Sequence, residues 1–199
     1  SLYKRDEDEP PHYIGVPEKV LREEEFLTRI EDAYRNNGYA IAVVGENVRG
    51  PTGMIGFQAE PWFVDDFGHP YYDSPARYLA EQVTRKIRVR CRYEKPGTIQ
   101  RSMLDSVSKT DYEEAHRVGE AAVEAASVGE RDVIVTLIRN SENPYACKTG
   151  LTPLKCVAGK TKFLPSCFIP DINGNIHNDF RVYLEPLIGL PAANPEPLY

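Results

Sequence analysis

The sequence has no long apolar run and no secretory-signal pattern. No segment of the 199 residues approaches the roughly 20 consecutive apolar residues that a membrane-spanning helix requires. Hydrophobic residues make up 41% of the chain and charged residues 27%, which is ordinary for a globular protein and excludes a disordered or fibrous chain. We therefore expect a folded, cytoplasmic protein that makes no contact with a membrane.

The motifs of several familiar sites are also missing. The chain contains no G-x-G-x-x-G, no P-loop, no G-x-S-x-G and no H-E-x-x-H, so no nucleotide site, nucleophilic serine or zinc site is recognisable. Its four cysteines lie far apart without a C-x-x-C pair, which favours reduced core thiols over a metal site or disulfides. The four histidines have no obvious acidic partner, and we expect them to be structural.

The balance of charges excludes a second class of protein. The formal net charge of −6 disfavours a general nucleic-acid binder, because such proteins carry an excess of lysine and arginine. A local cluster of cations can still bind a small anionic ligand, so the basic segments of the chain are candidate binding sites.

Apolar spacing along the chain alternates between the strand and helix periods. It predicts strands over residues 12–16, 39–44, 87–93 and 132–138. It predicts helices over residues 22–36, from 75 onward, and over 110–128, 153–158 and 176–184, with residues 47–72 mostly loop. The helix over 110–128 should begin with a capping box at Thr110 and Glu113 and pack closely through Gly119 and Ala122. The alternation predicts an α/β fold with a mainly parallel sheet.

The most informative local pattern is a basic segment within the third predicted strand. Lysine and arginine alternate with apolar residues over 86–93, so the cations share one face. A solvated face of an edge strand explains Lys86 and Arg88 equally well. Arg92 differs, because it lies nearest the carboxyl end of the strand, where α/β sheets bind ligands. Together with Arg101 in the following glycine-containing loop, it is a candidate phosphate clamp.

Acidic residues supply the other candidates. Glu18 directly follows a predicted strand and either accepts hydrogen bonds from sugar hydroxyls or favours the start of the next helix. Asp65 and Asp66 resemble a metal-binding pair, but adjacent acids in a loop are usually solvated turn residues.

Several blocks of sequence recur in an order that is specific when taken together. They are Val16-Pro17-Glu18, Gly45-Glu46, Asp65-x-Phe67-Gly68-His69, Arg92-x4-Gly97-Thr98-Ile99-Gln100-Arg101, Ser108-x-x-Asp111, Gly119-x-x-Ala122-Val123 and Tyr183-x-x-Pro186-Leu187-Ile188-Gly189. In this order they resemble the second half of 6-phosphofructokinases, in particular the pyrophosphate-dependent branch. The resemblance implies a three-layer, Rossmann-like α/β domain over residues 10–199. Residues 1–9 are expected to be a solvated lead-in, partly engineered, because the chain starts without methionine.

The resemblance also assigns roles to individual residues. It implies that Glu18 hydrogen-bonds the sugar of fructose 6-phosphate and that Arg92 binds the 6-phosphate. It implies that the Gln100-Arg101 pair contacts the same substrate. Thr98 stands where the family has histidine or tyrosine; its hydroxyl can donate to a phosphate oxygen but reaches less far.

The resemblance places the rest of the chemistry outside this sequence. In the family, the phosphate-donor loop, the Mg²⁺ ligands and the catalytic aspartate lie in an N-terminal half that has no counterpart here. We therefore expect no catalytic residue and no metal ligand in this chain, which would bind the acceptor sugar and be inactive alone. The full-length protein is expected to be a pyrophosphate-dependent 6-phosphofructokinase, a homo-oligomer that uses Mg²⁺ and makes fructose 1,6-bisphosphate.

Several alternatives stay open from the sequence. The phosphoryl donor is pyrophosphate by similarity to the branch, with ATP the other possibility. A non-catalytic sugar-phosphate-sensing domain on the same scaffold is the second functional hypothesis. A structural or oligomerisation domain with a merely solvated basic strand is the third.

Overall fold

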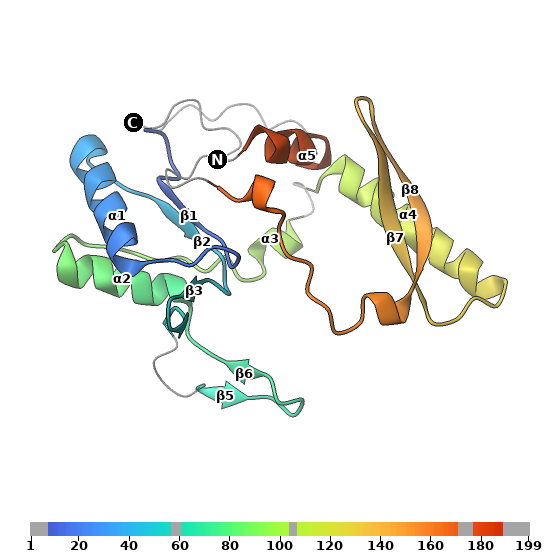
Figure 1. Ribbon diagram of the computed structural model, residues 1–199, viewed down its shortest axis with the longest axis horizontal. Coiled ribbons are helices and arrows are strands. Elements are labelled where there is room, and N and C mark those ends of the chain that lie inside the picture. The colour runs from blue at the N-terminus through green and yellow to red at the C-terminus, as the bar shows by residue number, and fades with distance from the viewer. Residues whose placement is uncertain (1–7, 57–60, 104–106, 171–176, 189–199) are drawn as a thin grey trace. The chain divides into compact units, whose positions relative to one another are not determined.

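The chain is divided into two compact units, which are described separately. The computed structural model describes residues 8–56, 61–103, 107–170 and 177–188 (Figure 1). The first unit comprises residues 1–97 and 164–177, and the second comprises residues 98–163 and 178–199.

A parallel β-α-β arrangement forms the centre of the first unit. Strands β1 (Tyr13–Gly15) and β2 (Ala42–Val44) pair in parallel, and helix α1 (Glu23–Asn37) connects them. Helix α1 ends at Gly38, whose left-handed φ of 77° lets its N–H bond the Tyr34 carbonyl. This confirms the helix predicted over residues 22–36.

Helix α2 (Pro75–Lys86) begins as the sequence predicts. Pro75 occupies the first turn, where its missing N–H costs nothing, and the Ser74 hydroxyl accepts the Ala76 N–H at 3.3 Å. The apolar faces of α1 and α2 enclose the core of the unit. The core residues are Leu21, Phe26, Leu27, Ile30, Val48, Ile55, Leu79 and Val83.

A carboxylate joins the two helices at the edge of this core. Glu23 of α1 accepts hydrogen bonds from the Tyr78 hydroxyl at 2.7 Å and from Lys86 Nζ at 2.6 Å, both on α2. The hydrogen bond from Lys86, more than any other contact, lowers the pKa of Glu23 below its usual 4.5, although partial burial opposes the shift.

The predicted strand over residues 87–93 is wrong, although its two faces are right up to Cys91; Tyr93, expected on the apolar face, is exposed. The segment is not assigned as a strand, and Arg88 has a left-handed φ of 65° that interrupts an extended chain. Ile87, Val89 and Cys91 nevertheless pack against the core, while the arginines between them are exposed. Side-chain alternation is therefore preserved without a ladder of strand hydrogen bonds.

Two short hairpins replace much of the predicted loop over 47–72. Strands β3 (Arg49–Gly50) and β4 (Gly53–Met54) form the first, and β5 (Phe63–Val64) and β6 (Pro70–Tyr71) form the second. The hairpin of β5 and β6 is visible in Figure 1. Residues 62–71 are called the aromatic arm here, because the rings of Trp62, Phe63 and Tyr71 contact one another across it.

The second unit is built on an antiparallel hairpin. Strand β7 (Val133–Glu142) was expected in a parallel sheet but pairs antiparallel with β8 (Tyr145–Pro153), which the sequence analysis missed. The chain is α/β, as predicted. Parallel pairing in the described residues is limited to β1 and β2, so a three-layer, Rossmann-like arrangement stays a prediction. The short 3₁₀ turn η2 (Leu154–Cys156) follows the hairpin, whereas the 3₁₀ turn η3 (Ser166–Phe168) belongs to the first unit.

Helix α4 (Lys109–Ser127) packs on this hairpin through a face that the sequence did not predict. Glu114 and Ala125 are buried, whereas Gly119 and Ala122 are exposed, so the predicted close packing at Gly119 is wrong. The Tyr145 hydroxyl donates to Glu114 at 2.6 Å. Burial is the main reason that the pKa of Tyr145 is raised, and the hydrogen bond to Glu114 adds to it, so this donor stays protonated. The helix is capped by Ser108, not by the predicted capping box.

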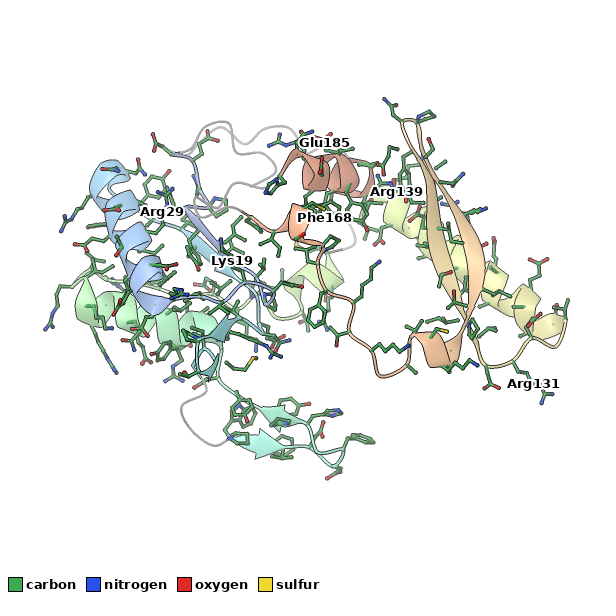
Figure 2. All side chains as sticks on the ribbon, in the orientation of Figure 1. Lys19, Arg29, Arg131, Arg139, Phe168 and Glu185 are labelled. Atoms are coloured by element: carbon green, nitrogen blue, oxygen red, sulfur yellow. The ribbon has the colours of Figure 1, made fainter. Side chains whose placement is uncertain are left out.

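Helix α5 (Asn178–Ile188) is fastened to the hairpin by a cation. The Arg139 guanidinium lies 4.8 Å from the ring centroids of both Tyr145 and Tyr183, and donates to the Tyr183 carbonyl at 2.9 Å (Figure 2). The helix continues past Pro186, where the sequence predicted its end. Within the described residues, every helix is too short or too polar to cross a bilayer.

The contact between α1 and α2 gives a pH-dependent prediction. Because the pKa of Glu23 is lowered on folding, its stabilisation is present above the unfolded-state value near 4.5 and is lost as the pH falls through the folded value. Glu23→Gln should lower the free energy of unfolding by about 1–2 kcal/mol at pH 7 and by much less at pH 3.

Urea unfolding at the two pH values measures this difference. Glu24→Gln is the matched control, since Glu24 is exposed on the same helical turn and should show no pH-dependent loss. An equal effect of the two substitutions at pH 7 would contradict the assignment.

Candidate functional site

Glu18 lies just beyond β1, at the carboxyl end of the parallel pair. Its side chain is half-buried, and its Oε1 accepts the backbone N–H of Leu164 at 2.9 Å. Among the described residues no hydrogen bond reaches Oε2, so one carboxylate oxygen positions the side chain while the other can accept a hydroxyl from a ligand. The sequence could not reveal the Leu164 contact, because 146 positions separate the two residues.

Arg92 lies exposed in the irregular segment that follows α2. It lines a hollow of about 540 Å³ whose floor is apolar, formed by Ile30, Leu79 and their neighbours on α1 and α2. The described residues offer Arg92 no carboxylate within ion-pair distance. Its planar set of donors is therefore available to an anion at the mouth of this hollow.

The remaining predicted residues belong to the second unit. Thr98 precedes helix α3 (Ile99–Ser102), which contains Gln100 and Arg101. The Thr98 carbonyl accepts the Arg101 N–H and the Ser102 hydroxyl, each at 3.0 Å, and the side chains of Thr98 and Arg101 are exposed. The structure thus places Glu18 and Arg92 in one unit and the Gln-Arg pair in the other, and their convergence on one ligand stays a prediction.

The acidic pair Asp65-Asp66 shapes a turn. Asp65 Oδ1 accepts the N–H groups of Phe67 at 3.0 Å and His69 at 2.8 Å, and Oδ2 lies 3.0 Å from His69 Nδ1. The backbone hydrogen bond from His69 is the main reason that the pKa of Asp65 is lowered. Gly68, with a φ of 83°, completes the turn. Asp65 is a turn residue, as expected, but its contacts orient His69.

The other side chains of types that can bind a metal or be oxidised do not cluster within the described residues. The described ranges contain no group of three or more histidine, cysteine, aspartate or glutamate side chains arranged to hold a metal, so their donors do not fit Mg²⁺. All four cysteines are free, with Cys91 and Cys147 partly buried and the other two exposed. His12 is structural, as expected: it is buried, and its Nδ1 accepts the Ile41 N–H at 3.0 Å.

Known proteins resemble this chain over nearly its whole length. No family model matches it. The pyrophosphate–fructose 6-phosphate 1-phosphotransferase of Halomonas elongata is 32% identical over 188 residues, covering 94% of this chain and 44% of the relative. That of Rhodospirillum rubrum is 33% identical over 195 residues, covering 95% and 48%. The crystal structure of the pyrophosphate-dependent phosphofructokinase from Marinobacter aquaeolei matches 94% of this chain and 43% of its own, with 31% identity and a TM-score of 0.75.

The chain belongs to the pyrophosphate-dependent branch of the phosphofructokinase family.

This phosphofructokinase chain spans about half the length of the curated relatives that it matches. The similarity extends through both compact units, so it includes the segments that carry Glu18, Arg92 and Arg101. The family assignment made from the ordered sequence blocks is confirmed.

The Asp65 turn gives a prediction that needs no ligand. Asp65→Ala should speed hydrogen exchange of the Phe67 and His69 amides, because both lose their acceptor. In the unsubstituted chain the same protection should persist above the usual carboxyl pKa of 3.8 and be lost as the pH falls through the lowered value.

Amide exchange followed by NMR measures both effects. Asp66→Ala is the control, since Asp66 is exposed and adjacent. Unchanged exchange at Phe67 and His69 in Asp65→Ala would show that the turn does not depend on this carboxylate.

Proposed function

We propose that this chain is the C-terminal, acceptor-binding half of a pyrophosphate-dependent 6-phosphofructokinase. The complete enzyme would transfer a phosphoryl group from pyrophosphate to O1 of fructose 6-phosphate and release fructose 1,6-bisphosphate. The observation that carries the proposal is similarity over 94% of the chain to proteins named for this activity, of which it spans 44%. Residues 10–199 would form the sugar-phosphate-binding part.

The exposed arginines would bind the 6-phosphate. Arg92 is exposed and has no carboxylate within ion-pair distance in the described part of the chain, and Arg101 is exposed on α3. Two guanidinium groups supply paired, charge-assisted donors that match a phosphate dianion. Thr98 would add a shorter hydroxyl donor, and the Gln100 amide would contact the same substrate.

Glu18 would orient the sugar. Because the Leu164 N–H holds Oε1, the carboxylate can present Oε2 in a fixed direction to a sugar hydroxyl. A carboxylate acceptor discriminates in favour of a hydroxyl group and against a second phosphate, since like charges repel. The proposed site therefore combines a cationic end for the phosphate with an acidic end for the ring.

The other half of the enzyme would supply the transfer chemistry. Phosphoryl transfer requires the donor, a metal and the acceptor in line, with charge neutralised at the transferring group. The described residues do not form a Mg²⁺ site, so the metal, the donor site and the catalytic base would come from the remaining half of the relatives' length. We further propose a cytoplasmic homo-oligomer that binds neither nucleic acid nor membranes.

Substitution of the two arginines tests the phosphate site. In the full-length enzyme, Arg92→Ala and Arg101→Ala should each weaken fructose 6-phosphate binding by about 1–3 kcal/mol, the cost of losing a charge-assisted hydrogen bond. Isothermal titration calorimetry measures the change. Arg90→Ala is the matched control, because Arg90 is exposed in the same segment as Arg92.

Two outcomes would oppose the proposal. Unchanged binding in both variants would favour a structural domain with a solvated basic face. Binding that depends on both arginines in a full-length protein that transfers no phosphoryl group from pyrophosphate or ATP would favour a sugar-phosphate sensor.

Two substitutions at Glu18 separate its structural and binding roles. Glu18→Gln keeps an oxygen for the Leu164 N–H but loses the charge, so it should weaken fructose 6-phosphate binding by about 1 kcal/mol and leave the melting temperature nearly unchanged. Glu18→Ala should lower both. Thermal unfolding and calorimetry provide the two readouts, and full binding by Glu18→Ala would remove Glu18 from the site.

A further inference from the structure

A second hollow lies in the first unit, beside the aromatic arm. Its volume is about 580 Å³, within the range of roughly 300–1,000 Å³ that is usual for small-molecule sites. One side is formed by Glu46 and Lys95, which follow β2 and the irregular segment after α2. The other side is formed by the aromatic arm, through Trp62, His69 and Tyr71. None of the residues proposed to bind fructose 6-phosphate lines it.

The charged groups around this hollow are already paired. Lys95 Nζ lies 3.5 Å from Glu46, and Asp73 lies 2.9 Å from Arg77 on α2. His69 Nδ1 lies 3.0 Å from Asp65. No excess positive charge is left to neutralise a phosphate, which makes this hollow chemically different from the surroundings of Arg92.

Pairing leaves much of the hydrogen-bonding capacity of these groups unused. Both the Glu46 and Lys95 side chains are mostly exposed, at 77% and 60%, so the carboxylate can accept and the ammonium can donate further bonds. Because Asp65 engages Nδ1, the Nε2 atom is the second hydrogen-bonding atom that the His69 ring can offer to a ligand. A ligand with several hydroxyl groups can use donors and acceptors of both kinds.

The aromatic arm supplies an apolar surface of matching size. Trp62 is 72% exposed, and its ring meets that of Tyr71 edge-on with centroids 6.0 Å apart. Exposed aromatic rings favour contacts with the weakly positive C–H groups of a saturated ring, because the ring face carries negative charge density. Hydroxyl groups at the edge and C–H groups on the face are the defining features of a cyclic polyol.

We propose that the hollow between the aromatic arm and Glu46–Lys95 binds an uncharged monosaccharide, at a site separate from that for fructose 6-phosphate. Paired charges favour the neutral sugar over its phosphate, and the exposed rings of Trp62 and Tyr71 cover one face of it. The inference does not depend on the proposed function, since it rests only on the contacts of the first unit.

The sequence provides its own probe of this site. Trp62 is the single tryptophan of the 199 residues, so its fluorescence reports the hollow directly. Titration of the whole chain with D-glucose and with D-fructose should change the emission in a saturable way, at millimolar concentrations. Inorganic phosphate should give no saturable change. Saturation-transfer NMR on the same samples detects a bound sugar that leaves the emission unaltered.

A matched pair of variants separates binding from general effects of sugar on the solvent. Glu46→Ala should weaken the response at least tenfold without affecting folding, because Glu46 is exposed and Lys95 is its ion-pair partner in the described part of the chain. Glu24→Ala, an exposed acid on α1, should respond as the unsubstituted chain does.

Several results would contradict the proposed monosaccharide site. The inference is overturned if neither readout saturates with either sugar, if Glu46→Ala responds as strongly as Glu24→Ala, or if phosphate displaces the sugar. Retention of the sugar response in an Arg92→Ala, Arg101→Ala double variant supports a separate site, whereas its loss would assign the sugar to the acceptor site instead.

Discussion

The parallel pairing of β1 with β2 is the constraint on which the first unit depends. Because the two strands run parallel, with α1 connecting them, the chain leaves both at the same edge, with Glu18 beyond one strand and Glu46 beyond the other. The approach is close: the Gly45 N–H bonds the Gly15 carbonyl at 2.8 Å, and a Cβ on Gly45 would lie 3.2 Å from the Pro17 ring. A glycine at this position lets the turns after β1 and β2 lie side by side. Glu18 and Glu46, the acidic groups proposed to contact ligands, therefore lie at the same edge of the strand pair.

The charged side chains near this edge differ in whether they are paired. Glu46 and Lys95 neutralise each other, and Leu164 holds one oxygen of Glu18, while Arg92 has no carboxylate near it in the described part of the chain. An acidic protein with a net charge of −6 thus keeps a local cation available for an anion. This difference in charge pairing is the basis for proposing a phosphate site at Arg92 and a neutral-sugar site beside Glu46 and Lys95.

Sequence reasoning succeeded where the determining contacts are local. The helix over residues 22–36, the start of α2 at residue 75 and the alternation of faces from Ile87 to Cys91 depend on a few neighbouring residues. Sequence reasoning failed where contacts between residues far apart in the sequence determine which face is buried or which strands pair. Glu114 is buried because Tyr145 donates to it from 31 positions away, so an acidic residue occupies the packed face of α4. Strand β8 was missed because its polar residues carry no clear apolar alternation, and only pairing with β7 reveals it. The family was identified correctly from the ordered blocks, whereas the roles assigned to the individual site residues stay predictions.

The central claim is that arginines from the two units and a carboxylate from the edge of β1 bind one phosphorylated hexose. A crystal structure of the complete enzyme with fructose 6-phosphate tests it most directly. The account predicts guanidinium nitrogens of Arg92 and Arg101 within about 3 Å of the 6-phosphate oxygens, and a Glu18 oxygen at the same distance from a sugar hydroxyl. Substrate bound elsewhere, with these three side chains turned toward solvent, would contradict it.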